Sequence, residues 1–223
     1  MPKDEKYGED MALIEMCVKG DTAAFEQLIL RYEKRIVAAA SRLCGDRQEG
    51  EDLAQEAFLK AWRALSGYKG QASFHTWMTT ILTNLWKDRL RKKRIPQDSL
   101  DEAIEGEEGM IRKQYRDEAP DPESEMETRE INEILDGFIQ SLKPEYKEAL
   151  ILRDVQGFSY EEVSAITGRN LGTVKSRINR ARTLMKVMIL DYQELNPGFF
   201  RLTQTGKDLT MAVTAKGGET CEG

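Results

Sequence analysis

Apolar residues recur along most of the chain at intervals of three and four, which is the spacing of an amphipathic α-helix. In the first half this spacing predicts three helices, over about 21–44, 48–65 and 73–95. Asp21 and Ser73 are residue types that cap helix starts, whereas Gly45 and Pro96 are types that end helices. No segment shows the sustained alternation of apolar and polar residues that a half-exposed strand requires. The first half is therefore predicted to be helical.

The second half repeats the helical spacing in a characteristic order of elements. Its helices are predicted over about 131–142, 144–156, 159–167 and from 170 onward. Ser159 and Glu162 have the spacing of a capping box, Gly168 can end that short helix, and Asn170 can cap the longer one. The longer helix is expected to bury Val174, Ile178, Ala181, Met185 and Met188. A short helix, a tight turn and a longer helix are typical of a helix-turn-helix, and the fold class is all-α.

The residues between the two halves break the helical pattern. Gln97–Glu127 holds twelve acidic residues against three basic ones, includes Pro120 and Pro122, and has few large apolar side chains. Such a composition is typical of a flexible linker. We therefore predict two small helical domains, 1–95 and 123–192, joined by an acidic flexible linker, 96–122, and followed by a flexible C-terminal tail, 193–223.

Charge is segregated along the chain although the net charge is −6. Trp86–Arg94 carries six bases against Asp88 alone, and Gly168–Leu190 carries six bases and no acid. Two basic segments on either side of an acidic linker indicate that each domain binds a polyanion.

The composition of the chain argues against most kinds of catalytic site. The chain has three cysteines, none in a C-x-x-C, and the single histidine His75, so disulfide frameworks, thiolate or histidine metal sites and histidine-based triads are not expected. Phosphate-binding glycine motifs are also missing from the sequence. We expect no catalytic residues, no metal and no cofactor. Without an apolar run of about 18 residues or a signal-like start, the chain is expected to be cytoplasmic, neither exported nor membrane-anchored.

The predicted recognition helix should present polar and basic side chains to the major groove of duplex DNA. Arg and Lys can fork onto guanine, Asn reads adenine, and Ser binds phosphate. The solvent-facing residues are Lys175, Ser176, Asn179, Arg180 and Arg182. The alternative is a solvated basic face of an ordinary bundle.

A second polar stripe is predicted on the 73–95 helix, formed by Thr80, Asn84, Lys87, Asp88 and Arg91. Basic residues beside the aromatic residues Tyr68, Phe74, Trp77 and Trp86 suit single-stranded nucleic acid, because rings can hold unstacked bases. Phe74 and Trp77 have the spacing of core residues, so Asn84 and Lys87 are the better candidates for contacts.

A cluster of carboxylates, Glu49, Glu51, Asp52 and Glu56, is expected on one exposed helix face. It favours a partner-binding face, and it leaves open a divalent-metal enzyme acting on DNA. A helix-turn-helix repressor or activator without other partners is a further alternative.

Four segments in order resemble bacterial sigma factors of the extracytoplasmic-function group. Two segments resemble region 2 of that family: EDLAQEAFLKAWRAL at Glu51–Leu65, and FHTWMTTILTNLWKDRLRKKR, which resembles its promoter-melting helix. Two others, FSYEEVSAITG and GTVKSRINRAR, resemble the helix-turn-helix of region 4. The resemblance covers about residues 10–192. Ser164 departs from the alanine that is usual in the family.

The resemblance implies a sigma factor, which is not an enzyme, that binds core RNA polymerase, directs it to promoters and helps to melt them. It implies that Asp52, Gln55, Glu56 and their neighbour Lys60 dock on the β′ clamp helices and that region 4 contacts the β flap. Positions that read or hold the minus-35 duplex are Lys175, Ser176, Arg177, Asn179 and Arg180, with Arg182 beside them. Positions that grip the melted minus-10 strand are Asn84, Lys87, Asp88 and Arg91, with the loop 66–73 around a flipped-out base. An anti-sigma factor is an expected partner, and the acidic linker is expected to follow the path of nucleic acid through the polymerase.

Overall fold

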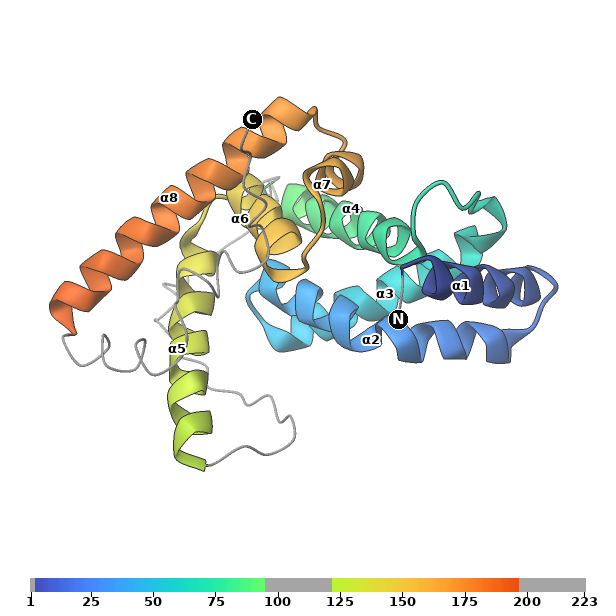
Figure 1. Ribbon diagram of the computed structural model, residues 1–223, viewed down its shortest axis with the longest axis horizontal. Helices are drawn as coiled ribbons and strands as arrows, with labels where there is room; N and C mark the ends of the chain where they lie inside the picture. The colour runs from blue at the N-terminus through green and yellow to red at the C-terminus, as the bar shows by residue number, and fades with distance from the viewer. Residues whose placement is uncertain (1–2, 95–121, 197–223) are drawn as a thin grey trace, which may run out of the picture.

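The computed structural model describes residues 3–94 and 122–196, and every regular element in these two segments is a helix (Figure 1). The helices are α1 (Lys3–Val18), α2 (Thr22–Cys44), α3 (Arg47–Ala64), α4 (Phe74–Arg94), α5 (Pro122–Ser141), α6 (Pro144–Leu150), α7 (Tyr160–Thr167) and α8 (Leu171–Leu195), with a short 3-10 turn at Leu65–Gly67 and a π turn at Ile151–Val155. The all-α prediction is confirmed. The predicted linker and the tail beyond Asn196 lie outside the described residues.

Helices α2 and α3 form an antiparallel pair whose ends follow the sequence prediction. The Asp21 carboxylate accepts from the Ala23 amide at 2.9 Å, and Gly45 ends α2 with a φ of 82°. Gly50 lies against α2 so closely that a Cβ there would be 2.4 Å from the Cα of Ser41. The sequence did not single out Gly50, although this contact lets the two helices meet.

Helix α1 was not among the predicted helices, and it packs against α2 and the 3-10 turn that follows α3. Ile14 and Cys17 are buried beneath it. Asp10 is also buried, where it accepts from Arg31 at 2.7 Å and from the hydroxyl of Tyr32. Burial raises the pKa of Tyr32 well above its ordinary value, and the hydrogen bond to Asp10 and the charge of Asp10 raise it further. A buried carboxylate that is paired on two sides fixes α1 on α2.

Helix α4 begins at its predicted cap, where the Ser73 hydroxyl accepts from the Thr76 amide at 3.1 Å. Phe74 is buried as expected, and Trp77 is partly buried between Tyr68 and Phe74. Trp86, one of the aromatic residues beside the predicted polar stripe, belongs to the core, with 4% exposure, and is not available to stack on a base in this arrangement. Leu82 and Met78, which the sequence analysis did not place, are fully buried as well.

The second half forms the predicted helix-turn-helix. The Ser159 hydroxyl and the Glu162 carboxylate cap each other's backbone amides, Gly168 turns the chain with a φ of 66°, and Asn170 caps α8. The predicted 144–156 helix is α6 followed by the π turn. Helix α8 continues to Leu195, so the first residues assigned to the C-terminal tail are helical.

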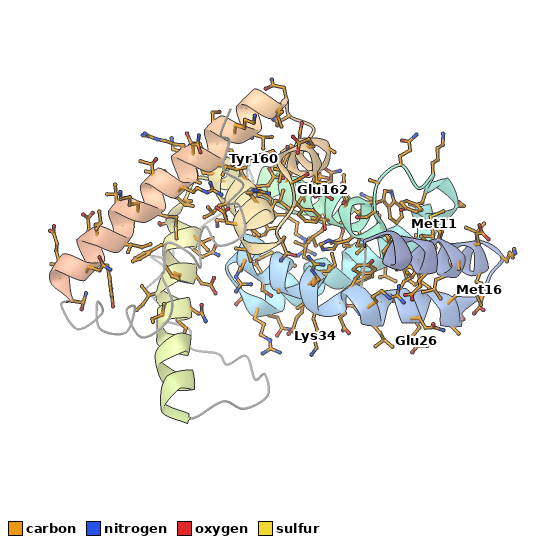
Figure 2. The ribbon with its side chains drawn as sticks, in the orientation of Figure 1. Met11, Met16, Glu26, Lys34, Tyr160 and Glu162 are labelled. Carbon is orange, nitrogen blue, oxygen red and sulfur yellow. The ribbon has the colours of Figure 1, made fainter. Side chains whose placement is uncertain are left out.

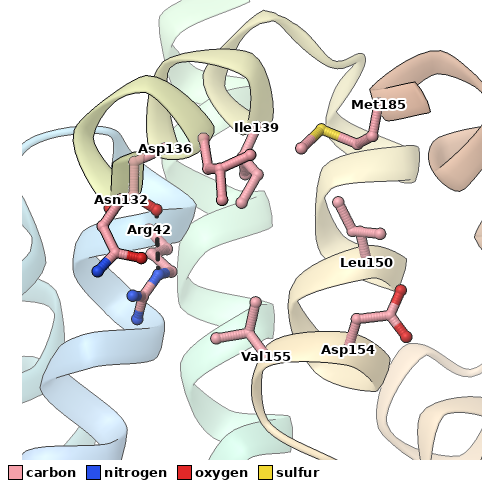
Figure 3. Close-up of a pocket in the computed structure, with 9 residues that line it drawn as sticks. Arg42, Asn132, Asp136, Ile139, Leu150, Asp154, Val155 and Met185 are labelled. Carbon is pink, nitrogen blue, oxygen red and sulfur yellow. Dashed lines mark hydrogen bonds and ion pairs between the residues drawn. The ribbon is translucent and has the colours of Figure 1, made fainter. Parts of the chain in front are cut away.

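The two halves pack against each other through α2 and α4 on one side and α5, α6 and α7 on the other (Figure 1). Leu150 and Ile151 join the same core cluster as Leu82 and Trp86. The Gln140 side chain donates to the Arg42 carbonyl at the end of α2, at 2.7 Å. A cavity of about 240 Å³ remains at this junction, with apolar walls that include Ile139 and Met185 and the Arg42–Asp136 ion pair at its rim (Figure 3).

Candidate nucleic-acid interface

The turn between α7 and α8 is held by side chains of both helices. Asn170 accepts from the Thr173 amide at 2.8 Å, and the Ser164 hydroxyl donates to the Arg169 carbonyl at 2.5 Å. Ser164, the departure from the family pattern, therefore adds a hydrogen bond across the turn. This rigid turn sets the direction of α8 relative to α7.

The outer side of α8 presents most of the residues predicted to contact duplex DNA. Lys175, Ser176, Asn179 and Arg180 are exposed, and Arg177 is half-buried. Ser176, Arg177 and Arg180 share an open hollow of about 460 Å³ with residues from the start of α6.

The first residue of α7, Tyr160 (labelled in Figure 2), has an aromatic ring that two cations approach. Arg153, which precedes α7, lies over this ring at 4.6 Å, and Lys175 of α8 approaches it at 5.9 Å. Cations near an aromatic face are attracted by its quadrupole. Lys175 is therefore exposed on α8 and also lies near a ring of α7.

Arg182 does not belong to this open surface: the sequence places it toward solvent, but the structure leaves it only partly exposed, and its contact with DNA stays a prediction. Its guanidinium forms a bidentate ion pair with Asp154, one arm at 2.9 Å, and the Asp154 side chain is only 5% exposed. This contact is the main cause of the raised pKa of Arg182. Sequence spacing could not show the pairing, because Asp154 lies on a different element.

On α4, the predicted stripe is divided. Asn84 and Arg91 are exposed, and Arg91 pairs with Asp88 at 3.2 Å. Lys87 instead reaches the second half of the chain, where its Nζ lies 3.0 Å from Glu148 Oε1. A cation that was predicted to face a DNA strand is thus engaged within the protein.

Glu148 is a buried carboxylate that the sequence analysis did not identify. It is 5% exposed, and this burial raises the pKa of its carboxyl, while Lys87, Arg177 and Arg169 act in the opposite direction. Lys87 therefore offsets only part of the cost of burying the carboxylate.

The predicted docking face on α3 is exposed at Asp52, Gln55, Glu56 and Lys60. Glu56 pairs with Arg89 at 2.7 Å and Glu49 with Lys93 at 2.9 Å, so these two acids also join α3 to α4. Leu59, which the sequence analysis missed, is 55% exposed beside them. Its apolar type at an otherwise polar exposed face could have indicated an interface anchor.

The acidic cluster does not form a metal site in the described part of the chain. In residues 3–94 and 122–196, no three His, Cys, Asp or Glu side chains gather in a way that could hold a metal ion. Glu49, Glu51 and Glu56 each face a cation instead of converging on one point.

None of the described helices is long and apolar enough to cross a membrane.

Comparison with known proteins agrees with this geometry. The family model of sigma-70 region 2 matches residues 28–95, and that of sigma-70 region 4 matches 132–185. The RNA polymerase sigma-H factor of Pseudomonas aeruginosa is 38% identical over 175 residues, which cover 78% of this chain and 90% of that protein. The ECF RNA polymerase sigma-E factor of Escherichia coli K12 is 38% identical over 179 residues, with coverage of 78% and 90%. The chain belongs to the extracytoplasmic-function (ECF) group of RNA polymerase sigma factors.

Two solved structures share the fold of this chain. CnrH, in complex with the cytosolic domain of CnrY, superposes with a TM-score of 0.58 at 22% identity, covering 82% of this chain and 98% of that one. RpoE of Bartonella quintana, in complex with the anti-sigma factor NepR, superposes with a TM-score of 0.56 at 27% identity, covering 74% and 96%. As an ECF sigma factor, the chain acts in promoter recognition and transcription initiation, with α2–α4 in region 2 and α6–α8 in region 4.

Proposed function

We propose that this sigma factor, which is not itself an enzyme, joins core RNA polymerase in the cytoplasm and brings it to promoters through two separate DNA-binding surfaces. The domain limits 1–95 and 123–192 are part of this proposal. The observation that carries it is the exposed polar and basic side of α8, set behind a capped, hydrogen-bonded turn. A nucleic-acid surface needs exposed donors on a rigid element.

The minus-35 duplex is assigned to the first turns of α8. Asn179 and Arg180 are proposed to read base edges, and Lys175, Ser176 and Arg177 to hold phosphates or bases beside them. Support comes from the exposure of these side chains and from their place in the first turns of α8, because a helix N-terminus favours phosphate. Arg182 is left out of this set, because it is engaged with Asp154.

The melted minus-10 strand is assigned to α4 and to the loop before it. Asn84, Lys87, Asp88 and Arg91 are proposed to grip the strand, with a flipped-out base held near the loop 66–73. In that loop Tyr68 donates to the Ala72 carbonyl at 2.5 Å and packs on Trp77 at 5.1 Å. This packing supports a preformed loop beside the strand-binding residues.

Docking on the β′ clamp helices is assigned to the exposed face of α3. Asp52, Gln55, Glu56 and Lys60 provide its polar contacts, and we add Leu59 as the apolar anchor. Region 4 is proposed to contact the β flap. An anti-sigma factor is proposed as a further partner, supported by the similarity to RpoE in its complex with NepR.

The test is run-off transcription from fragments of the source genome, with core polymerase and with or without this protein. The proposal predicts discrete transcripts that require both proteins. Tight sequence-specific binding of the free chain to duplex DNA, without any effect of core polymerase, would instead indicate a repressor or activator.

Two substitutions separate docking from melting. Asp52→Arg should prevent assembly with core polymerase while the chain stays folded, because a surface change costs within about 0.5 kcal/mol of stability. Asn84→Ala should leave assembly intact and slow the opening of promoter DNA. The matched controls are Glu26→Arg and Gln27→Ala, at exposed positions of α2 outside the two proposed surfaces (Glu26 is labelled in Figure 2). Assembly that survives Asp52→Arg would show that the docking face is wrongly assigned.

A further inference from the structure

One side of α4 is covered by the other half of the chain. His75, Thr79, Thr83 and Lys87 follow one another at intervals of four along this helix, and we call them the α4 stripe. Its two ends contact region 4, since the His75 ring stacks on Phe158 at 4.7 Å and Lys87 lies 3.0 Å from Glu148. Thr79 and Thr83 between them are 1% and 0% exposed.

The residue types of the α4 stripe are unusual for a permanent contact between helices. The Thr83 hydroxyl donates to the Thr80 carbonyl at 3.2 Å, but the Thr79 hydroxyl has no hydrogen-bond partner among the described residues. A buried polar group without a partner destabilises an interface, whereas the same group in water or against nucleic acid is satisfied. The stripe therefore fits a surface that is not always covered.

The charges at the Lys87 end are also those of a nucleic-acid site. The Glu148 carboxylate is approached by Lys87 from region 2, and Arg177 and Arg169 of region 4 act on it electrostatically. Lys87 and Arg177 are the cations that the proposed function assigns to the minus-10 strand and the minus-35 duplex. A single carboxylate thus faces cations of both DNA-binding surfaces, as a phosphate oxygen would.

We propose that the free chain is autoinhibited, with α6 and α7 covering the α4 stripe and the Glu148 carboxylate occupying on Lys87 the place of a DNA phosphate. The stripe becomes available only when the two halves separate. This inference rests on the proposed role of Lys87 in binding the minus-10 strand.

A reversible lock tests whether the halves must separate. The Arg35 guanidinium donates to the Gln156 carbonyl across the junction at 3.2 Å, outside the proposed DNA contacts. In a full-length chain with Cys44 and Cys221 replaced by serine, Arg35→Cys and Gln156→Cys can be joined by a short reducible bis-maleimide, while Cys17 is buried.

The locked chain should lose run-off transcription about tenfold or more, and reduction of the linker should restore it. A locked chain that transcribes as well as the reduced one would overturn the autoinhibition. If the double-cysteine chain is inactive both before locking and after reduction, and the wild type is inactive too, the result would instead count against the proposed function.

Charge substitutions test the part played by Glu148, with the rate of cross-linking as the readout. Glu148→Lys adds a cation beside Lys87, Arg177 and Arg169, so cross-linking should slow about tenfold. Glu26→Lys, the same change on the exposed side of α2, should leave the rate unchanged. Circular dichroism checks that each variant is folded.

The partner of Glu148 is tested from the other side of the junction. Lys87→Glu should also slow cross-linking, and combining it with Glu148→Lys should recover much of the rate, because the two charges are exchanged. Equal rates for Glu148→Lys and Glu26→Lys, or a double variant as slow as the slower single one, would contradict the proposed contact.

Discussion

Helices α8 and α4 carry the two basic surfaces of this sigma factor, and they differ in what covers them. The outer side of α8 leaves Lys175, Asn179 and Arg180 exposed. On α4, Lys87 is paired with Glu148 and the two threonines of the α4 stripe are buried. The surface proposed for duplex DNA is therefore open in the free chain, whereas part of the surface proposed for melted DNA is closed.

The difference suggests an order of events. Duplex DNA is present before polymerase opens a promoter. The surface of α8 that is proposed to bind it can therefore stay exposed in the free chain. Single-stranded nucleic acid is bound with little sequence preference by basic and aromatic surfaces, so a covered α4 avoids such binding until the halves separate.

The largest effect is expected at Gly50, where a substitution should destabilise region 2, the half that carries the covered surface of α4. Gly50→Ala places a Cβ about 2.4 Å from the backbone of Ser41, which cannot move without separating α2 from α3. We expect a loss of about 3 kcal/mol in the free energy of unfolding, measured by urea denaturation. Gly137→Ala, at an open position on α5, is the control and should not lose stability in this way.

Arg182→Ala should reduce stability and not alter sequence readout. It leaves the buried Asp154 carboxylate without its bidentate partner, and because Arg182 is partly exposed we expect a loss of about 2 kcal/mol. Denaturation measures this loss, and competition between promoter variants measures readout. A changed base preference with normal stability would return Arg182 to the DNA-binding set.

Arg180→Ala and Lys87→Ala should separate the open surface from the covered one. Arg180→Ala should weaken binding of the holoenzyme to minus-35 duplex DNA by roughly 1 to 2 kcal/mol and relax discrimination at one position. Lys87→Ala should leave that affinity unchanged and slow promoter opening, followed by permanganate reactivity of unpaired thymines. An equal loss of affinity for all DNA sequences in Arg180→Ala would instead assign Arg180 to a phosphate contact.

The smallest expected effect is a pH dependence of the closed arrangement. Since burial raises the pKa of Glu148 above its ordinary value of 4.5, the closed form holds the proton more firmly than the open one. Its contribution to closure is fully present below the ordinary pKa and is lost as the pH rises through the raised pKa. Thiols react more slowly with maleimide in acid, so each rate is taken relative to that of the same chain carrying Glu148→Gln at the same pH. This relative rate of cross-linking between positions 35 and 156 should rise, by less than about threefold, from about pH 7.5 to about pH 5.

Glu148→Gln isolates this titration from other groups at the junction. His75, Lys87, Arg177 and Arg169 stay in place in this variant, so any pH response that they cause remains. The response of the wild type minus that of Glu148→Gln is the part due to the carboxyl. A difference of zero, or of opposite sign, would show that the pKa of Glu148 is not raised on closure.

Local signals made much of each half predictable. Caps such as Asp21, Ser159 and Asn170, and the stops Gly45 and Gly168, act within a few residues of their own helix, and each is found in its predicted role. Exposure of Lys175, Asn179 and Arg180 followed from the spacing of the buried residues on the same helix.

What the sequence missed depends on contacts between distant segments. Glu148 and Lys87 are on helices of different halves, as are Arg42 and Asp136, and no periodicity pairs such residues. The burial of Trp86 also depends on packing between segments that the pattern of one helix does not show. The tertiary arrangement, not helix spacing, decides whether a basic stripe is available.

The most direct test of the account is the distance between the two halves in the free chain and in the holoenzyme. Spin labels at Glu33 on α2 and Lys186 on α8, both exposed, can be placed in a chain with Cys44 and Cys221 replaced by serine. Pulsed electron paramagnetic resonance should give one short distance for the free chain and a longer one when core polymerase is bound. The same short distance in an active holoenzyme would contradict the claim that region 4 must leave the α4 stripe.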